Sequence, residues 1–161
     1  MTSPLGRYAG EAHDAPVTVR LLAAPLKIWQ RAAEHHDELM REMALLALSP
    51  TPPELPTRLL QLVDLLGRQY GAAGARPDDA REQAMAAGLD RLDLSYEVPR
   101  GIAADAQRMR DLLDEVENYC QTDLLTLEQS PVQAAFSRWY IDQFVQQAAG
   151  RPAVPWPGPW D

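Results

Sequence analysis

The strongest constraint on this chain is a helical repeat of apolar residues across positions 25–48, which ends in a run of prolines. Apolar and aromatic side chains recur there every three or four residues, and charged side chains occupy the opposite face. The predicted inward stripe consists of Leu26, Trp29, Ala33, His36, Met40, Met43 and Ala47. Residues 49–56 contain four prolines in eight positions, a segment too stiff to continue a helix. The sequence therefore predicts a long amphipathic helix followed by a sharp break.

The rest of the chain predicts further helices over residues 56–70, 77–87, 102–121 and 131–149. Gly71 and Gly74 are interpreted as the end of the second helix. The alanine-rich helix that follows ends at Gly88 and has a shallow face, so weak, peripheral packing is expected. Ser130 and Gln133 flank Pro131 in the spacing of a capping box, which marks the start of the last helix.

Two segments, 17–21 and 92–98, alternate apolar and polar residues with the period of a half-buried strand. They either pair with each other against the helices or serve as extended connectors. The predicted fold is mainly α, a bundle-like single domain of four to five helices over residues 17–150, with the two-stranded β element left open. Residues 1–16 are expected to form a flexible lead-in.

The last segment, residues 151–161, is rich in proline and contains Trp156 and Trp160. Such a segment is extended, because its prolines cannot join a helix. The two indoles either fold back on the helices as a clamp or are presented to a partner.

The charge balance excludes several classes of function. The 161 residues include 15 basic and 23 acidic side chains, a net charge of −8, which argues against binding to nucleic acid or to an anionic membrane surface. No apolar run has the length of a membrane span or follows the start as a signal peptide would, so a cytoplasmic location is expected. The single cysteine, Cys120, rules out an intramolecular disulfide and a cysteine-rich zinc site, and a small buried side chain is favoured over a reactive thiol.

The densest polar cluster is residues 34–38, which contains His35 and His36 between acidic side chains. These five groups are consecutive and so fan around a helix, and no other predicted helix contains a histidine that could complete a metal site. His36 is therefore interpreted as a hydrogen-bonded core histidine, with His35 at its border. No metal, cofactor or catalytic residue is predicted, because motifs for serine nucleophiles, phosphate-binding loops and zinc proteases are lacking.

Four stretches carry a resemblance to a known group of proteins. They are VTVRLLAAPLKIWQRAAEHHDELMREMALLA at 17–47, LDLSYEVP at 92–99, LLDEVENYCQTDLLTL at 112–127 and FSRWYIDQFVQQAAGRPAVPWPG at 136–158. Together they resemble small actinobacterial helical proteins associated with partner-switching loci, beside STAS-domain antagonists, anti-sigma kinases and PP2C-type phosphatases. The resemblance implies a regulatory or scaffold role without catalysis, with a STAS-domain or anti-sigma-type regulator as the protein partner.

Two hypotheses of function follow. In the first, the protein acts through protein contacts in a stress or sigma-factor circuit, and the candidate contact residues are His35, Glu38, Asp111, Asp114, Glu115, Trp156 and Trp160. In the alternative, it is a sensor of a small molecule or metal, or an enzyme, with a pocket between the first and last helices near His36, Trp139 and Tyr140. Self-association through apolar helix faces is left open.

Overall fold

The computed structural model describes residues 15–123 and 129–161. In chain order, the elements are β1 (Pro16–Pro25), α2 (Leu26–Ala47), α3 (Glu54–Ala86), β2 (Arg91–Pro99), α4 (Ile102–Asp123) and α5 (Pro131–Ala148). The fold is mainly helical with one small antiparallel sheet, which confirms the predicted class and shows that the two strands pair. The predicted lead-in up to residue 14 and the side chain of Cys120 lie outside the described residues.

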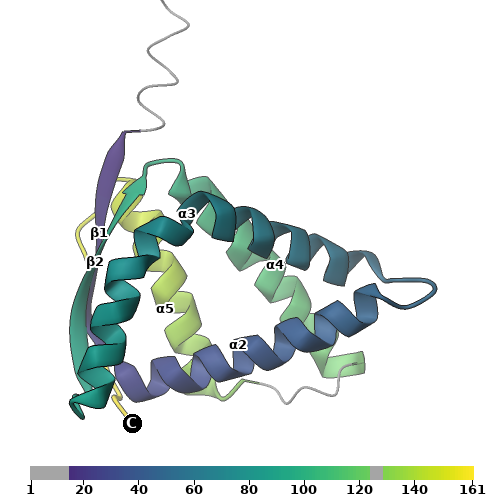
Figure 1. Ribbon diagram of the computed structural model, residues 1–161, viewed down its shortest axis with the longest axis horizontal. Helices are drawn as coiled ribbons and strands as arrows, with labels where there is room; N and C mark the ends of the chain where they lie inside the picture. Colours follow the sequence, from purple (N-terminus) through teal and green to yellow (C-terminus); the bar gives the residue numbers. More distant parts are fainter. Residues whose placement is uncertain (1–14, 124–128) are drawn as a thin grey trace, which may run out of the picture.

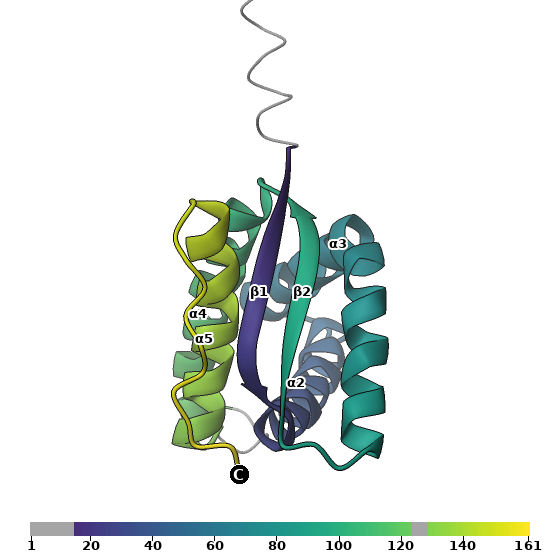
Figure 2. The same cartoon turned by 90° about the vertical axis from the view of Figure 1, so that its left-hand side faces the viewer.

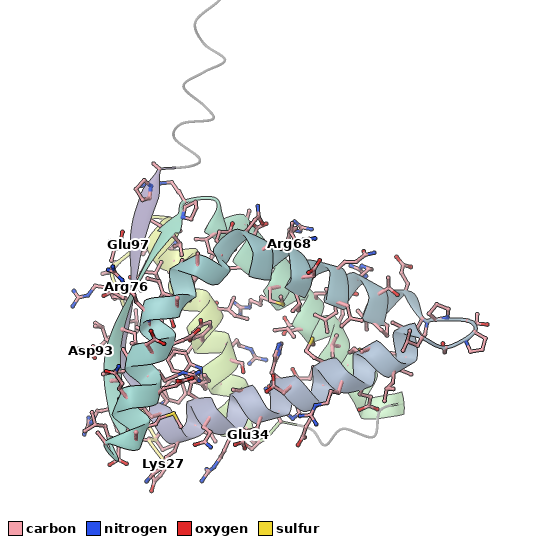
Figure 3. The ribbon with its side chains drawn as sticks, in the orientation of Figure 1. Lys27, Glu34, Arg68, Arg76, Asp93 and Glu97 are labelled. Atoms are coloured by element: carbon pink, nitrogen blue, oxygen red, sulfur yellow. The ribbon has the colours of Figure 1, made fainter. Side chains whose placement is uncertain are left out.

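Seen down its shortest axis, the helices and strands are arranged as a triangular frame (Figure 1). Helices α2 and α3 form two sides and the sheet forms the third, while α4 and α5 lie on the opposite side of the molecule from α3, as Figure 2 shows. Figure 2 shows the sheet face-on, with α3 on the side of β2 and α5 on the side of β1. Charged side chains such as Glu34, Arg68 and Asp93 point outward from this frame (Figure 3).

The sheet turns one face of each strand inward. Val19 lies opposite Tyr96 and Leu21 opposite Leu94, and all four side chains are buried. The ladder is interrupted between Leu21 and Ala24. There Ala23 has a φ of 53°, and its N–H donates to Asp93 Oδ1 at 2.7 Å. A positive φ is uncommon for a residue with a side chain, so this bulge needs support from its surroundings.

The buried side chains form two clusters, one at each end of the frame. The first joins the sheet to the start of α2, to α5 and to Trp156. The second joins the outer halves of α2 and α3 to α4 and contains Leu39, Met43, Leu59, Leu62, Leu112 and Val116. Helix α2 buries Ile28, Ala32 and Leu39 rather than Ala33, His36 and Met40 of the predicted stripe. Leu26, Trp29 and Met43 of the predicted stripe are buried, and the buried set departs from a single stripe because α2 contacts α3, α5 and β1.

Helix α3 corrects the predicted organisation, because it runs unbroken through Gly71, Gly74 and Pro77. Figure 1 shows it approach the sheet and then turn to run beside β2. Glycine and proline inside a helix cost stability, and proline permits a bend. Packing outweighs this cost: Pro77 and Ala84 are buried, so the expected peripheral packing of this segment was wrong. Where α3 ends, Gly88 has a φ of 74°, as predicted for a helix stop.

The start of α5 is the capping box that the sequence predicted. Ser130 Oγ accepts from the N–H of Gln133 at 3.3 Å, and Gln133 Oε1 accepts from the N–H of Ser130 at 3.0 Å. Pro131 occupies the first turn. These contacts satisfy backbone donors that a helix start otherwise leaves unpaired.

The tail folds back as a clamp. Trp156 is only 4% exposed, and its backbone N–H donates to the Leu22 carbonyl at 2.9 Å. Trp160 Nε1 donates to the Ala23 carbonyl at 3.3 Å, so the backbone of Trp156 and the indole of Trp160 both hold the bulge of β1. The proposal that Trp156 contacts a partner is therefore corrected, because its ring is already packed inside the fold. Trp160 is partly buried beneath Arg91, whose guanidinium lies 4.7 Å from the ring centre.

Gln147 of α5 completes the outer edge of β1. Its Oε1 accepts from the N–H of Arg20 at 2.8 Å, and its Nε2 donates to the carbonyl of Arg20 at 2.7 Å. The same Nε2 donates to Gln143 Oε1, which also accepts from the N–H of Val154 in the tail. The side-chain amides of the two glutamines thus join the strand, the helix and the tail. Both glutamines are buried, so water does not compete for these hydrogen bonds.

We expect Gln147→Glu to lower the free energy of unfolding by about 2–4 kcal/mol at neutral pH. The new side chain cannot donate to the Arg20 carbonyl, and a carboxylate is placed beside the carbonyl oxygens of Arg20 and Gln143. Burial raises the pKa of such a carboxyl, and the protonated form restores a donor, so the deficit shrinks as the pH falls. Urea denaturation of both proteins across the acidic pH range measures this deficit in the free energy of unfolding.

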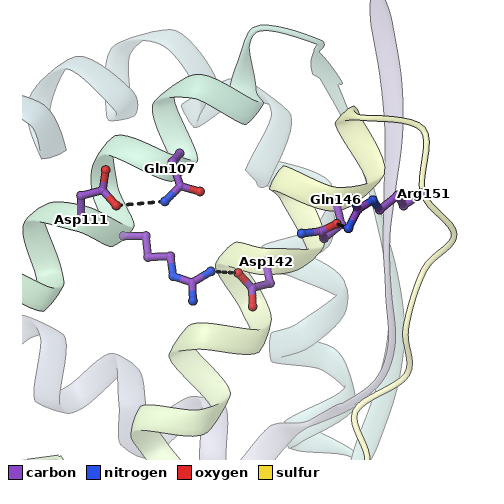
Figure 4. A network of polar contacts seen from close by, with 6 residues as sticks. Gln107, Asp111, Asp142, Gln146 and Arg151 are labelled. Carbon is purple, nitrogen blue, oxygen red and sulfur yellow. Dashed lines mark hydrogen bonds and ion pairs between the residues drawn. The ribbon is translucent and has the colours of Figure 1, made fainter.

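The matched control is Gln146→Glu on the same helix. Gln146 Oε1 accepts from Arg151 Nη1 at 2.6 Å on the exposed side, a contact that glutamate keeps (Figure 4). This variant should stay within about 0.5 kcal/mol of the parent protein. Equal losses at positions 146 and 147 would contradict the role given to the buried amide.

Candidate functional site

The interior of the frame contains an apolar pocket of about 220 Å³ between α3, β2, α4 and α5. Its walls are formed by Leu66, Tyr70, Ala73, Gly74, Tyr96, Val98, Ile102, Ala106, Met109, Tyr140, Ile141 and Phe144. Small residues on α3 and α4 leave the space, and aromatic rings from β2 and α5 close it on the other side. We call this the apolar pocket.

Two tyrosines from separate elements meet in its wall. Tyr96 comes from β2 and Tyr140 from α5, and their hydroxyl groups are hydrogen-bonded to each other. Burial, as the main cause, raises the pKa of both phenols, and the charge of Asp78 raises the pKa further. Both tyrosines therefore stay protonated at neutral pH. The ring of Phe144 lies 5.3 Å from that of Tyr96 and 5.2 Å from that of Tyr140.

A third tyrosine is held at the wall by a carboxylate. The hydroxyl of Tyr70 donates to Asp105 Oδ2 at 2.5 Å, and Arg108 Nη1 contacts Asp105 Oδ1 at 3.4 Å. Burial and the contact with Asp105 both raise the pKa of Tyr70. Asp105 thus joins α4 to α3.

Arg81 links α3 to the aromatic cluster behind the pocket. Its guanidinium lies 5.2 Å from the centre of the Trp29 ring, and its Nη2 lies 4.0 Å from Asp78 Oδ1. Trp29 in turn packs edge-on against Tyr140, with ring centres 5.4 Å apart. Arg81 Nε is buried without a partner among the described residues. A cation over an aromatic face is stabilised by the ring's electrons.

A second pocket of about 110 Å³ lies between α2, α4 and α5; most of its lining surface is apolar, and we call it the polar pocket after the charged side chains in its wall. Its wall includes His35, His36, Arg110, Asp114 and Arg138. Burial lowers the pKa of both histidines below 6.5; the charge of Glu38 opposes this shift at His35, and that of Asp37 at His36. Arg110 pairs with Asp142 of α5, which is labelled in Figure 4, so one cation of this wall is already engaged.

The residues of the predicted pocket do not converge. His36 lines the polar pocket and Tyr140 the apolar pocket, whereas Trp139 lies in neither wall. Trp139 Nε1 donates to the Val154 carbonyl at 2.9 Å, and its ring lies 5.6 Å from that of Trp156. The tail thus contacts the side chain that the alternative hypothesis placed near a pocket. His36, expected in the core, is only partly buried.

The predicted contact residues on α2 and α4 are exposed or partly so, and some already have partners. Asp111 accepts from Gln107 Nε2 at 2.9 Å (Figure 4), and Glu115 forms an ion pair with Arg58 at 3.0 Å. Asp114 and Glu38 are exposed, Asp114 at the mouth of the polar pocket. The acidic face of α4 is thus partly neutralised by arginine from α3.

Sequence reasoning did not single out Tyr70 or Tyr96 as members of a site. A signal was present for Tyr96, because it falls in the inward phase of an alternating strand and carries a polar group into an apolar interior. Tyr70 gave a similar signal, because it falls on the apolar inner face of the helix predicted over residues 56–70. The wall beside Tyr70 could not be predicted, because Ala73 and Gly74 lie in the continuation of α3 past Gly71.

Comparisons with models of protein families, with curated proteins and with solved structures gave no significant match for this chain. Within residues 15–123 and 129–161, no three side chains of histidine, cysteine, aspartate or glutamate are arranged to hold a metal ion. None of the helices within these described residues is both long enough and apolar enough to cross a bilayer.

We expect the polar pocket to make stability depend on pH near 6.5. The pKa of His35 and of His36 is lower in the folded chain than in the unfolded chain, so the unfolded state binds more protons as the pH falls through 6.5. Stability is therefore lost toward acid, and the double variant His35→Gln/His36→Gln should lose less of it. Urea denaturation at about pH 7.5 and about pH 5.5 measures the difference.

Glu34, an exposed residue next to His35 on the same helix, supplies a control. Glu34→Gln changes the charge of α2 but not the burial of an imidazole, and should leave the pH dependence as in the parent protein. If the double histidine variant loses as much stability toward acid as the parent, the buried imidazoles are not the cause.

Proposed function

We propose that this protein is a ligand-binding protein without catalytic activity, and that its site is the apolar pocket. The observation that carries the proposal is the volume of about 220 Å³ beside walls that are almost wholly apolar. An engineered apolar cavity of about 150 Å³ is sufficient to hold benzene. The pocket thus has room for a small apolar molecule, whose entry removes apolar surface from water on both partners.

The chemistry of the wall supports binding rather than catalysis. Its titratable groups are three tyrosines, and the raised pKa values of Tyr70, Tyr96 and Tyr140 keep each phenol protonated. General acid–base catalysis needs a group whose pKa lies near the working pH. A wall that neither takes up nor releases protons suits reversible binding.

The origin of the wall supports a sensing role. Its residues come from α3, β2, α4 and α5, which are far apart in the chain. A molecule bound there contacts all four elements at once and adds its binding free energy to the stability of their arrangement. This is the small-molecule form of the alternative hypothesis, with the site moved away from Trp139.

A screen of small aromatic compounds by thermal unfolding tests the proposal. We expect several neutral compounds of one or two rings to raise the unfolding temperature, and Ala106→Leu to abolish the rise by filling the pocket from α4. Ala104→Leu is the matched control, because Ala104 lies on the same helix but is exposed. No rise with any compound, or an undiminished rise in Ala106→Leu, would contradict the proposal.

A second function, as a protein-binding regulator in the cytoplasm, is supported by one surface feature. Leu45 and Leu48, at the end of α2, are 71% and 82% exposed, beside the proline-rich connection to α3. The two leucines are three residues apart at a helix end, and an exposed apolar patch is a feature of protein contact surfaces. The resemblance to partner-switching proteins suggests a STAS-domain or anti-sigma-type regulator as that partner, with Glu38 and Asp114 as further contact residues.

Affinity purification from the native host tests this second function. We expect a regulatory protein to co-purify with the parent chain and to be lost with Leu45→Ser/Leu48→Ser. Leu89→Ser, at a side chain 50% exposed between α3 and β2, is the control and should retain the partner. Retention of the same partner by the double variant would rule out this end of α2 as the contact surface.

A further inference from the structure

We infer that the apolar pocket takes a neutral ring compound carrying one hydrogen-bond acceptor, and that the hydroxyl pair of Tyr96 and Tyr140 donates to this acceptor. The inference rests on the proposed function, because it specifies the ligand of the same pocket. A small aromatic ketone is an example of this chemistry.

The hydroxyl pair supplies one donor. Two phenols contain two hydroxyl hydrogens, and the bond between Tyr96 and Tyr140 uses one of them. The other hydrogen has no acceptor among the described residues. Both rings line the pocket, so the spare hydrogen is available to a bound molecule. By contrast, the Tyr70 hydroxyl is already committed to Asp105.

The charges around the pocket favour a neutral ligand. The two carboxylates at its edge are paired: Asp105 with Arg108 and Tyr70, and Asp78 with Arg81. A Cβ added to Gly74 would lie 3.4 Å from Asp78 Oδ2, so this carboxyl sits directly against the wall. It repels an anion, while its pairing leaves no free charge for a cation. An ion would lose its hydration without compensation.

The shape of the wall favours a flat ring. Ala73 and Ala106 leave room on one side, and the rings of Tyr96, Tyr140 and Phe144 form the other. Aromatic rings attract one another in edge-on and tilted arrangements, which these three already adopt. A ligand ring extends that arrangement into the pocket.

Four probes on one skeleton test the inference by calorimetric titration of the full chain: indane, indanone, aminoindane and indanecarboxylate. We expect indanone to bind about tenfold more tightly than indane, since one added hydrogen bond is typically worth about that factor. The charged amine and carboxylate should bind more weakly than indane. If the amine or the carboxylate bound more tightly than the neutral probes, the inference of a neutral ligand would be overturned.

Variants then locate the donor. Tyr96→Phe or Tyr140→Phe alone leaves one hydroxyl free to donate, whereas the double variant removes both, so only the double variant should lose the preference for indanone over indane. Tyr70→Phe is the matched control, because it removes a hydroxyl from the same wall and should keep the preference. A preference that survives in the double variant would overturn the assignment of the donor.

A measurement on the parent protein covers the case in which the double variant does not fold. The carbonyl stretch of bound indanone should lie at lower frequency than in hydrocarbon solvent, as expected for a hydrogen-bonded ketone. An unshifted stretch would overturn the inference but leave the pocket intact as a binding site. Failure of indane and indanone alike to bind would instead overturn the proposed function itself.

Discussion

The structure depends on the pairing of the Gln147 side chain with the backbone of Arg20. A two-stranded sheet has two open edges and is marginal by itself. The amide of Gln147 offers β1 one donor and one acceptor, as a third strand would, and Trp156 adds a backbone bond at Leu22. On the other side, β2 packs along α3 (Figure 2). Helices and tail thus stabilise a sheet too small to stand alone.

The fixed sheet determines what faces the pocket. Because side chains alternate along a strand, a slip of one residue would turn Tyr96 to solvent and bring Ser95 inward. The interrupted ladder near Ala23 and its support by Trp160 hold the register at that end. The bend of α3 completes the wall of the apolar pocket, since it brings Gly74 into the same wall as Tyr140.

Local signals predicted the parts of the fold that local chemistry determines. The capping box at Ser130 and the alternation around Tyr96 needed only neighbouring residues, and both were recognisable in the sequence. The continuity of α3 was not, because Gly71 and Pro77 favour a break and only burial against the sheet outweighs them. The pocket could not be predicted for a related reason. A pocket remains where side chains leave a space unfilled. Trp139 lies in neither pocket wall because it bonds to Val154 of the tail, and the path of the tail depends on contacts with residues distant in the sequence.

Helix α5 connects the two pockets to the sheet. Ile141 lies in the walls of both pockets, and one turn away Phe144 packs on Tyr96. Gln147, a further turn along, holds the strand, so pocket and sheet edge are built on one rigid element. A ligand that binds only the folded protein raises the protein's free energy of unfolding by mass action. Because Gln147 and the pocket stabilise the same packing of α5, loss of the amide contact should weaken binding, and an occupied pocket should offset part of that loss.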